Sequence, residues 1–263
     1  MTTVLVTGAA GAIGTALRER LPSFGWDVCS FDREPVADGI IGDIGSPTDL
    51  DDASAGVGAI VHLAGQPTEA PWPVIRAANI DGTFQVFEAA RRAGVRRVVY
   101  ASSNHAVGFT PIESKQSGTE QPADLPPRPD TLYGVSKVFG EALARYYVER
   151  YGFAVACLRI GTFEPRPTHE RSLSTWLSPD DCARLVDACL RAADLTYALV
   201  WGISNNTRRM WSLDTGRALG YEPQDDAEAY AHDVQHGKHP SDAYLGGGFA
   251  SEGFGIDEVA ARW

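Results

Sequence analysis

Tyr133 and Lys137 lie four residues apart in the segment TLYGVSKVFGEAL (131–143), which has the pattern of a helix. Residues at positions i and i+4 share one face of a helix, so the phenol and the ammonium can lie side by side. A phenol has a reference pKa of about 10, and a nearby positive charge lowers it by stabilising the phenolate. The pair is therefore a candidate acid–base couple. An ordinary helical pair has the same spacing, so other features of the chain must decide between the two interpretations.

A second group of polar side chains follows the strand-like run RRVVY (96–100). It contains Ser103, Asn104 and His105 in the stretch ASSNHAVGF. Ligands of α/β proteins bind at the carboxyl ends of the strands. A hydroxyl, an amide and an imidazole at such an end form a polar platform for a hydroxyl-bearing substrate. For His105, a role in holding the loop is an equal alternative.

Three glycines recur at a fixed spacing near the start of the chain. Gly8, Gly11 and Gly14 stand between a strand-like run and a helical run in VLVTGAAGAIGTAL. Glycines allow a tight turn and close approach to a pyrophosphate, and a helix N-terminus attracts the negative charge of that group. Small residues also serve close packing of a helix on a strand. The position at the first strand–helix junction favours a dinucleotide site.

Acidic residues after the next strands bear on which dinucleotide is bound. Asp32 ends the second strand-like run, where a carboxylate accepts hydrogen bonds from ribose hydroxyls and repels a 2′-phosphate. This favours NAD over NADP, although the neighbouring Arg33 could tolerate a phosphate. Asp43 follows a short third strand and could either frame the adenine or serve only a turn.

Alternating strands and helices must position these groups. The patterns predict a doubly wound, Rossmann-type parallel sheet of the α/β class. One domain is expected, in which 1–160 mainly binds the dinucleotide and 161–263 mainly forms a small substrate lobe and a C-terminal tail. The polar chain from about 225 suggests a loosely attached arm or an oligomer contact. Strands are expected at 4–7, 27–31, 59–65, 96–102, 154–160 and 198–204, and helices at 13–21, 73–93, 131–151 and 178–192.

Composition excludes several classes of partner. The 263 residues carry a net charge of −11, which disfavours nucleic acid and anionic membranes. No apolar run approaches the ~20 residues of a membrane span. An anionic substrate would need a local cation. The four cysteines have no CxxC spacing, so reduced thiols and a cytoplasmic location are expected.

In combination, the motifs resemble the extended short-chain dehydrogenases/reductases, the NAD-dependent epimerase/dehydratase superfamily. The match covers roughly 1–220, and HLAG (62–65) and NIDGT (79–83) belong to it. The resemblance implies that Ser103, Tyr133 and Lys137 are catalytic and that Lys137 also holds the nicotinamide ribose. It implies further NAD contacts from Ala12, Ile13, Ile44, Leu63, Ala64, Gly65, Asn79, Tyr133 and Ile160.

Several stretches, among them SSNHAVG, YGVSKVFGE and LSTWLS, are similar to the uronate dehydrogenases of this superfamily. Those enzymes oxidise the anomeric hydroxyl of galacturonate or glucuronate with NAD and give an aldarolactone. Pro67 stands where they have a substrate-touching serine, so Thr68 is expected to compensate. The resemblance implies substrate contacts from Ser103, Asn104, His105, Tyr133, Thr162 and Arg171, with Arg171 on the sugar carboxylate.

Other functions stay open. Neutral aldose dehydrogenases and an NAD-dependent glucose-6-phosphate dehydrogenase share the short length, and Arg171 would then serve a phosphate or only a surface ion pair. An epimerase or dehydratase with retained NAD usually has a larger lobe, and a non-catalytic NAD sensor usually loses Tyr133 or Lys137. The polar surroundings of His232, His236 and His239 predict no metal site. A homo-oligomer, a dimer or larger, is expected through the long helices.

Overall fold

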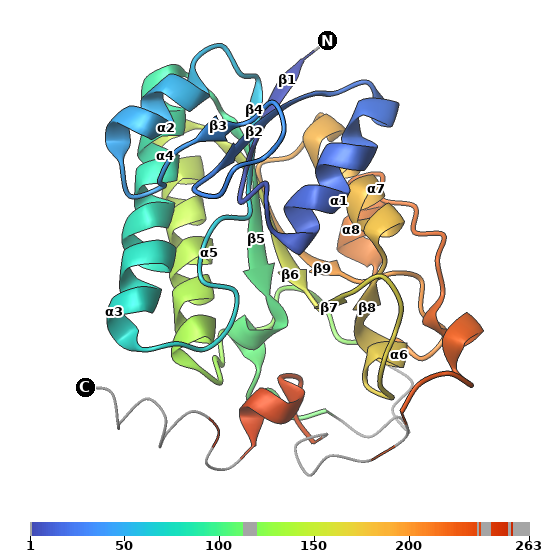
Figure 1. The fold of residues 1–263 in the computed structure, drawn as a ribbon. Coiled ribbons are helices and arrows are strands. Elements are labelled where there is room, and N and C mark those ends of the chain that lie inside the picture. Colours follow the sequence, from blue (N-terminus) through green and yellow to red (C-terminus); the bar gives the residue numbers. More distant parts are fainter. Residues whose placement is uncertain (1, 113–119, 236, 238–242, 252–253, 255–263) are drawn as a thin grey trace.

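Seven parallel strands form the central sheet of the computed structural model, which describes residues 2–112, 120–235, 237, 243–251 and 254. Their order is β3-β2-β1-β4-β5-β6-β9 (Figure 1). The order reverses between β1 and β4, which is the crevice where such sheets bind ligands. The predicted doubly wound α/β fold is confirmed. The strands are β1 (Thr3–Thr7), β2 (Asp27–Asp32), β3 (Ile40–Ile41), β4 (Ala59–His62), β5 (Arg97–Ser103), β6 (Ala154–Ile160) and β9 (Tyr197–Gly202).

Helices cover both faces of the sheet. In Figure 1, α2, α4 and α5 lie on one side, whereas α1 and α7 lie on the other. Because successive side chains of a strand point to opposite faces, Val4 and Val6 face one helical layer and Leu5 faces the other. The helices are α1 (Ala12–Arg20), α2 (Pro47–Ser54), α3 (Trp72–Ile75), α4 (Gly82–Ala93), α5 (Leu132–Tyr151) and α7 (Pro179–Arg191).

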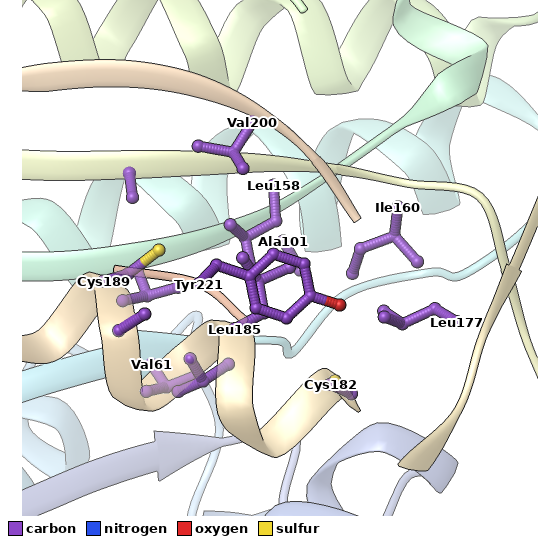
Figure 2. Close-up of a cluster of buried hydrophobic side chains, with 14 of the residues drawn as sticks. Val61, Ala101, Leu158, Ile160, Leu177, Cys182, Leu185, Cys189, Val200 and Tyr221 are labelled. Atoms are coloured by element: carbon purple, nitrogen blue, oxygen red, sulfur yellow. The ribbon is translucent and has the colours of Figure 1, made fainter. Parts of the chain in front are cut away.

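The core beneath α1 and α7 is shown in Figure 2. Leu185 and Cys189 of α7 pack there against Val61 and Leu158 of the sheet, together with Tyr221. Cys182 and Cys189, which lie seven residues apart in α7, are both buried. All four cysteines are free, and reduced thiols in the cell stay a prediction.

Helix ends follow the local sequence. Ser178 caps α7 by accepting a hydrogen bond from the backbone N–H of Asp181, and Pro179 takes the first helical position. Thr131 caps α5 in the same way, through the N–H of Gly134. Gly152 adopts φ 67° and ends α5, a conformation that strongly favours glycine. The Thr131 cap therefore fixes where the helix carrying Tyr133 begins.

The helix expected at 73–93 is real but interrupted. A π-helical turn, η2 (Arg76–Asp81), separates α3 from α4. Such turns are frequent at functional sites because they redirect one side chain. Here the turn carries Asn79, which is buried. Hydrophobic periodicity alone did not distinguish the π-turn from α-helix.

The second half adds small elements beside the sheet. β7 (Thr162–Phe163) pairs with β8 (Trp176–Leu177) in a two-stranded parallel sheet. The prediction of a loosely attached arm from about 225 is wrong for the described residues. Ala227 and Leu245 are buried, and the carboxylate of Asp226 holds the Thr207 hydroxyl. The remaining elements are α6 (Ser172–Thr175), α8 (Asp214–Ala218) and the 3-10 turns η1 (Leu21–Phe24), η3 (Asn104–Val107), η5 (Ala227–Tyr230) and η6 (Gly247–Ala250).

The described residues bear only in part on two other expectations, the absence of a metal site and the absence of a membrane span. His236 and His239 lie outside them, so the predicted absence of a metal site in the tail stays a prediction. None of the helices in the described ranges is both long and apolar enough to cross a membrane.

Candidate active site

A cavity of about 930 Å³ opens at the carboxyl ends of the strands. This size is in the usual range for cofactor and ligand sites. It receives the loops that follow β1 to β5, together with residues of α5 and the C-terminal segment. Its lining includes 10–14, 31–34, 42–45, 63–67, 101–105, Gly8, Tyr133, Lys137, Ile160, Gly161, Phe163 and Phe249.

The glycine turn after β1 forms one end of the cavity. Gly8 has φ 75°, and a Cβ there would lie 2.7 Å from the backbone nitrogen of Ala64. A Cβ on Gly14 would lie 2.2 Å from the carbonyl oxygen of Gly8. Gly11 is the N-cap of α1 and offers no side chain to its first N–H groups. The turn therefore leaves room and unsatisfied donors for a pyrophosphate, so the residues fit a dinucleotide.

Asp32 is fixed at the end of β2. Its Oδ2 accepts a hydrogen bond from the N–H of Ala10 at 2.9 Å, and its Oδ1 accepts one from Glu34 at 3.0 Å. The carboxylate thus braces the glycine turn and places negative charge in the cavity.

The structure brings Asp32 together with most of the predicted cofactor residues. These are Ala12, Ile13, Asp43, Ile44, Leu63, Ala64, Gly65 and Ile160.

Asn79 is the exception among the predicted cofactor residues, because it does not line the cavity. Its Oδ1 accepts from the N–H of Gln66 at 2.7 Å, while its Nδ2 donates to the Gln66 carbonyl at 3.0 Å and to the Ser136 hydroxyl at 2.9 Å. These hydrogen bonds of Asn79 therefore link the loop after β4 to α5, outside the cavity lining.

The three predicted catalytic residues meet at the centre of the cavity. Ser103 ends β5, and Tyr133 and Lys137 come from the first turns of α5. The Lys137 ammonium donates to the carbonyl of Ala101 at 2.8 Å and lies 5.4 Å from the centre of the Tyr133 ring. A hydroxyl, a phenol and an ammonium therefore converge on one wall.

Burial controls the acidity of this group. It raises the pKa of Tyr133 to about 12, with a smaller rise from the Asp130 carboxylate and a lowering from the hydrogen bond with Ser103. Burial also lowers the pKa of Lys137 to about 8. The pKa of Tyr133 is thus raised overall, because the loss of hydration on burial is the largest effect. Burial therefore favours the protonated form of Tyr133, and a role as base requires charge or hydrogen bonds that offset this effect.

His105 and Asn104 lie in the 3-10 turn η3, directly after β5. The His105 ring lies edge-on to the Tyr133 ring, at 5.9 Å, and stacks on Phe249 at 4.2 Å. The Asn104 amide donates to the carbonyl of Leu245 at 3.1 Å. Both residues line the cavity, as expected for substrate contacts.

The other predicted substrate residues lie outside the cavity lining. The Arg171 guanidinium donates to the same Leu245 carbonyl that Asn104 uses, so Arg171 stands at the rim next to a lining residue. The Thr162 hydroxyl shares a hydrogen bond of 2.7 Å with that of Thr175. Thr68 is exposed and contacts Gln66 instead. The expected compensation by Thr68 is therefore not seen, because the chain turns its side chain toward solvent.

Sequence patterns missed three residues of this site. Phe249 follows the glycine-rich LGGG, which indicated only a tail. Glu69 accepts hydrogen bonds from the N–H groups of Leu132 at 3.2 Å and Tyr133 at 2.8 Å, and so caps the catalytic helix from another loop. Asp130 pairs with His105. All three act across long sequence separations, which periodicity and spacing do not report.

His62 lies behind the site at the end of β4. Its Nδ1 is 2.8 Å from the Thr7 hydroxyl and its Nε2 is 3.2 Å from the Thr83 hydroxyl. Burial, together with the charge of Lys137, lowers the pKa of His62 to about 3. The ring is therefore neutral in the folded protein.

We expect His62 to make the protein sensitive to acid. In the unfolded chain this ring takes up a proton below about pH 6.5, whereas the folded chain does not. The free energy of unfolding should fall as the pH falls through that window, by up to about 1.4 kcal/mol per pH unit from this group. Urea unfolding from pH 7 to pH 4.5 should show a shallower decline in His62→Gln than in His232→Gln, whose ring is exposed. Parallel declines would contradict the assignment.

Comparison with known proteins identifies the family of the chain. The model of the family described as "NAD dependent epimerase/dehydratase family" matches residues 4–185. Uronate dehydrogenase of Pseudomonas syringae pv. tomato is 37% identical, covering 95% of this chain and 94% of the relative. NAD-dependent glucose-6-phosphate dehydrogenase of Haloferax volcanii is 40% identical, covering 86% and 95%.

Solved structures agree with this placement. A mutant of uronate dehydrogenase from Agrobacterium tumefaciens, complexed with NAD, superposes with a TM-score of 0.88 at 38% identity, covering 96% of this chain and 98% of that one. With its glycine turn, its Ser103–Tyr133–Lys137 group and these matches, the chain belongs to the NAD-dependent epimerase/dehydratase family.

Proposed function

We propose that the chain is an NAD-dependent dehydrogenase that oxidises the anomeric hydroxyl of a hexuronic acid, galacturonate or glucuronate, to the aldarolactone. The carrying observation is the single cavity in which a dinucleotide turn, the group Ser103, Tyr133 and Lys137, and the polar platform Asn104–His105 face one another. Uronate dehydrogenases that match over nearly the whole chain support the same activity.

The residues of the cavity divide the work of this reaction. When bound, NAD supplies the hydride acceptor. The Tyr133 phenol must first release its own proton; its phenolate oxygen then takes the proton of the anomeric hydroxyl, and the Ser103 hydroxyl hydrogen-bonds the reacting oxygen and orients it. Lys137 supplies positive charge beside the phenolate that this proton transfer requires. The walls around Tyr133 exclude water, which strengthens each of these interactions.

The sugar carboxylate is proposed to bind Arg171. The guanidinium stands at the rim beside Asn104, and the planar fork of an arginine matches a carboxylate. Replacing Arg171 with alanine should raise KM for galacturonate about 10- to 100-fold, the loss expected for one charged hydrogen-bonding partner. Steady-state kinetics would measure it, with the Kd of NAD unchanged.

Arg208→Ala is a suitable control for that variant. Arg208 pairs with Glu228 on the surface and is not a cavity residue. An unchanged KM in Arg171→Ala would remove Arg171 from the substrate site.

The experiment that tests the function is NADH formation with galacturonate, glucuronate, glucose, arabinose and glucose 6-phosphate. A rate with uronates that far exceeds the others is expected. A preference for glucose 6-phosphate would give the chain the activity named for its Haloferax relative and would make Arg171 a phosphate ligand. No turnover of any free sugar, with NAD retained through purification, would favour an epimerase.

Three wider proposals accompany this function. Residues 161–263 contribute mainly to the substrate side, supported by Gly161, Phe163 and Phe249 in the cavity lining. A homo-oligomer is proposed through α4 and α5, on which Phe84 and Tyr146 are exposed, and light scattering in solution would test it. A cytoplasmic location is supported by the four free cysteines, and fractionation of cells would test it.

A further inference from the structure

Asp130, the residue before the N-cap of α5, carries a carboxylate with no solvent exposure. Its Oδ2 lies 2.9 Å and its Oδ1 3.1 Å from Nδ1 of His105, whose side chain is 15% exposed. The Thr131 hydroxyl donates to Oδ1 at 3.1 Å. A buried carboxylate is costly unless such partners compensate it.

The backbone around Asp130 prevents the carboxylate from turning away. A Cβ on Gly108 would lie 2.0 Å from its Oδ2, and a Cβ on Gly246 would lie 1.8 Å from the same atom. The two glycines are joined by a hydrogen bond of 2.9 Å from the Gly246 N–H to the Gly108 carbonyl. Only glycine at both positions leaves space for the carboxylate, which is therefore a fixed acceptor aimed at His105.

This contact decides the protonation pattern of the imidazole. A carboxylate can only accept, so Nδ1 must carry the proton, and Nε2 of the neutral ring is left as an acceptor. The remainder of His105 is also fixed. Its backbone N–H donates to the Ser103 hydroxyl at 3.2 Å, and its ring is held between Tyr133 and Phe249. Since the ring lines the cavity, Nε2 is the atom that can meet a substrate.

We propose that Asp130 is a positioning residue, which holds His105 in the Nδ1–H form so that Nε2 accepts a hydrogen bond from a hydroxyl of the substrate. The proposal rests on the proposed function, because it assigns His105 to a hydroxyl-rich sugar next to Tyr133. In the reversed tautomer Nε2 carries the proton and would donate a hydrogen bond to that hydroxyl. The hydroxyl would then have to rotate so that it accepts, which takes it away from its reacting geometry.

The test is a kinetic cycle of Asp130→Asn, His105→Ala and the double variant. In the wild-type background, Asp130→Asn should lower kcat/KM for galacturonate about 10- to 100-fold, as expected when one orienting hydrogen bond is reversed. In the His105→Ala background, the same change should cost less than about threefold, because its effect passes through the missing ring. The Kd of NAD should not move in any of them.

A purely structural role for Asp130 predicts a different result. If it only held the glycine pair together, Asp130→Asn would cost the same in both backgrounds, which would overturn the proposal. Asp124→Asn, an exposed acid on the same loop, is the matched control and should behave as wild type.

A second readout keeps the two hypotheses separate. Two-bond 1H–15N correlation spectra, with the ring assigned from His105→Ala, should show His105 as the Nδ1–H form in the wild type and a shift toward Nε2–H in Asp130→Asn. An Nε2–H ring in the wild type would overturn the proposal even if galacturonate is turned over. Failure to turn over any uronate would sink the proposed function, while the spectra would still decide how Asp130 sets the ring.

Discussion

Tyr133→Phe should reduce kcat for galacturonate oxidation by about 10²- to 10⁴-fold, the contribution typical of a positioned general base. The change removes one oxygen and keeps the buried ring, so the fold and the Kd of NAD should be retained. Stopped-flow or steady-state NADH formation measures kcat, and quenching of protein fluorescence measures NAD binding.

Tyr146→Phe provides the matched control. Tyr146 is on the same helix, but its side chain is about half exposed and far along α5 from the cavity lining. Its loss should leave kcat within about twofold of wild type, as for surface changes in general. A Tyr133→Phe enzyme with full activity would remove the phenol from the mechanism.

Arg159→Met should lower the free energy of unfolding by about 3–5 kcal/mol, since it leaves the buried carboxylate of Glu141 without its partner. The Arg159 and Glu141 side chains are 1% and 5% exposed and are joined by two hydrogen bonds of 2.8 and 2.9 Å. Arg159 also donates to the carbonyls of Ala123 and Leu125, and so fastens the loop that leads to α5. At about 2–4 °C per kcal/mol, Tm should fall by roughly 6–20 °C.

Two further variants identify the cause of that loss. Arg145→Met removes an exposed pair with Glu149, which is worth less than about 1 kcal/mol. Arg159→Met combined with Glu141→Leu removes both charges and should be more stable than Arg159→Met alone. If Arg159→Met unfolds at the same urea concentration as Arg145→Met, the pair does not contribute as a buried ion pair.

The sequence predicted most of the sheet because its central strands bury both faces and read as short apolar runs between helical patterns, whereas the two residues of β3 are exposed. It also predicted that Ser103, Tyr133 and Lys137 come together, since Tyr133 and Lys137 share a helix and Ser103 ends a strand. These features are local, so spacing along the chain is enough to find them.

The features that sequence reasoning missed or misplaced depend on contacts between distant segments. The hydrogen bonds of Glu69 to the start of α5 and of Arg171 to Leu245 join residues more than sixty positions apart. The orientation of Thr68 depends on the path of a loop. The rise in the pKa of Tyr133 depends on how completely the assembled walls remove water, which no motif encodes.

The two halves of the site come from separate stretches of chain. The glycine turn and Asp32 belong to β1–α1–β2, whereas Ser103, Tyr133 and Lys137 belong to β5 and α5. Substitutions around the end of β2 are therefore expected to change nucleotide preference with less effect on Ser103, Tyr133 and Lys137, which lie on β5 and α5.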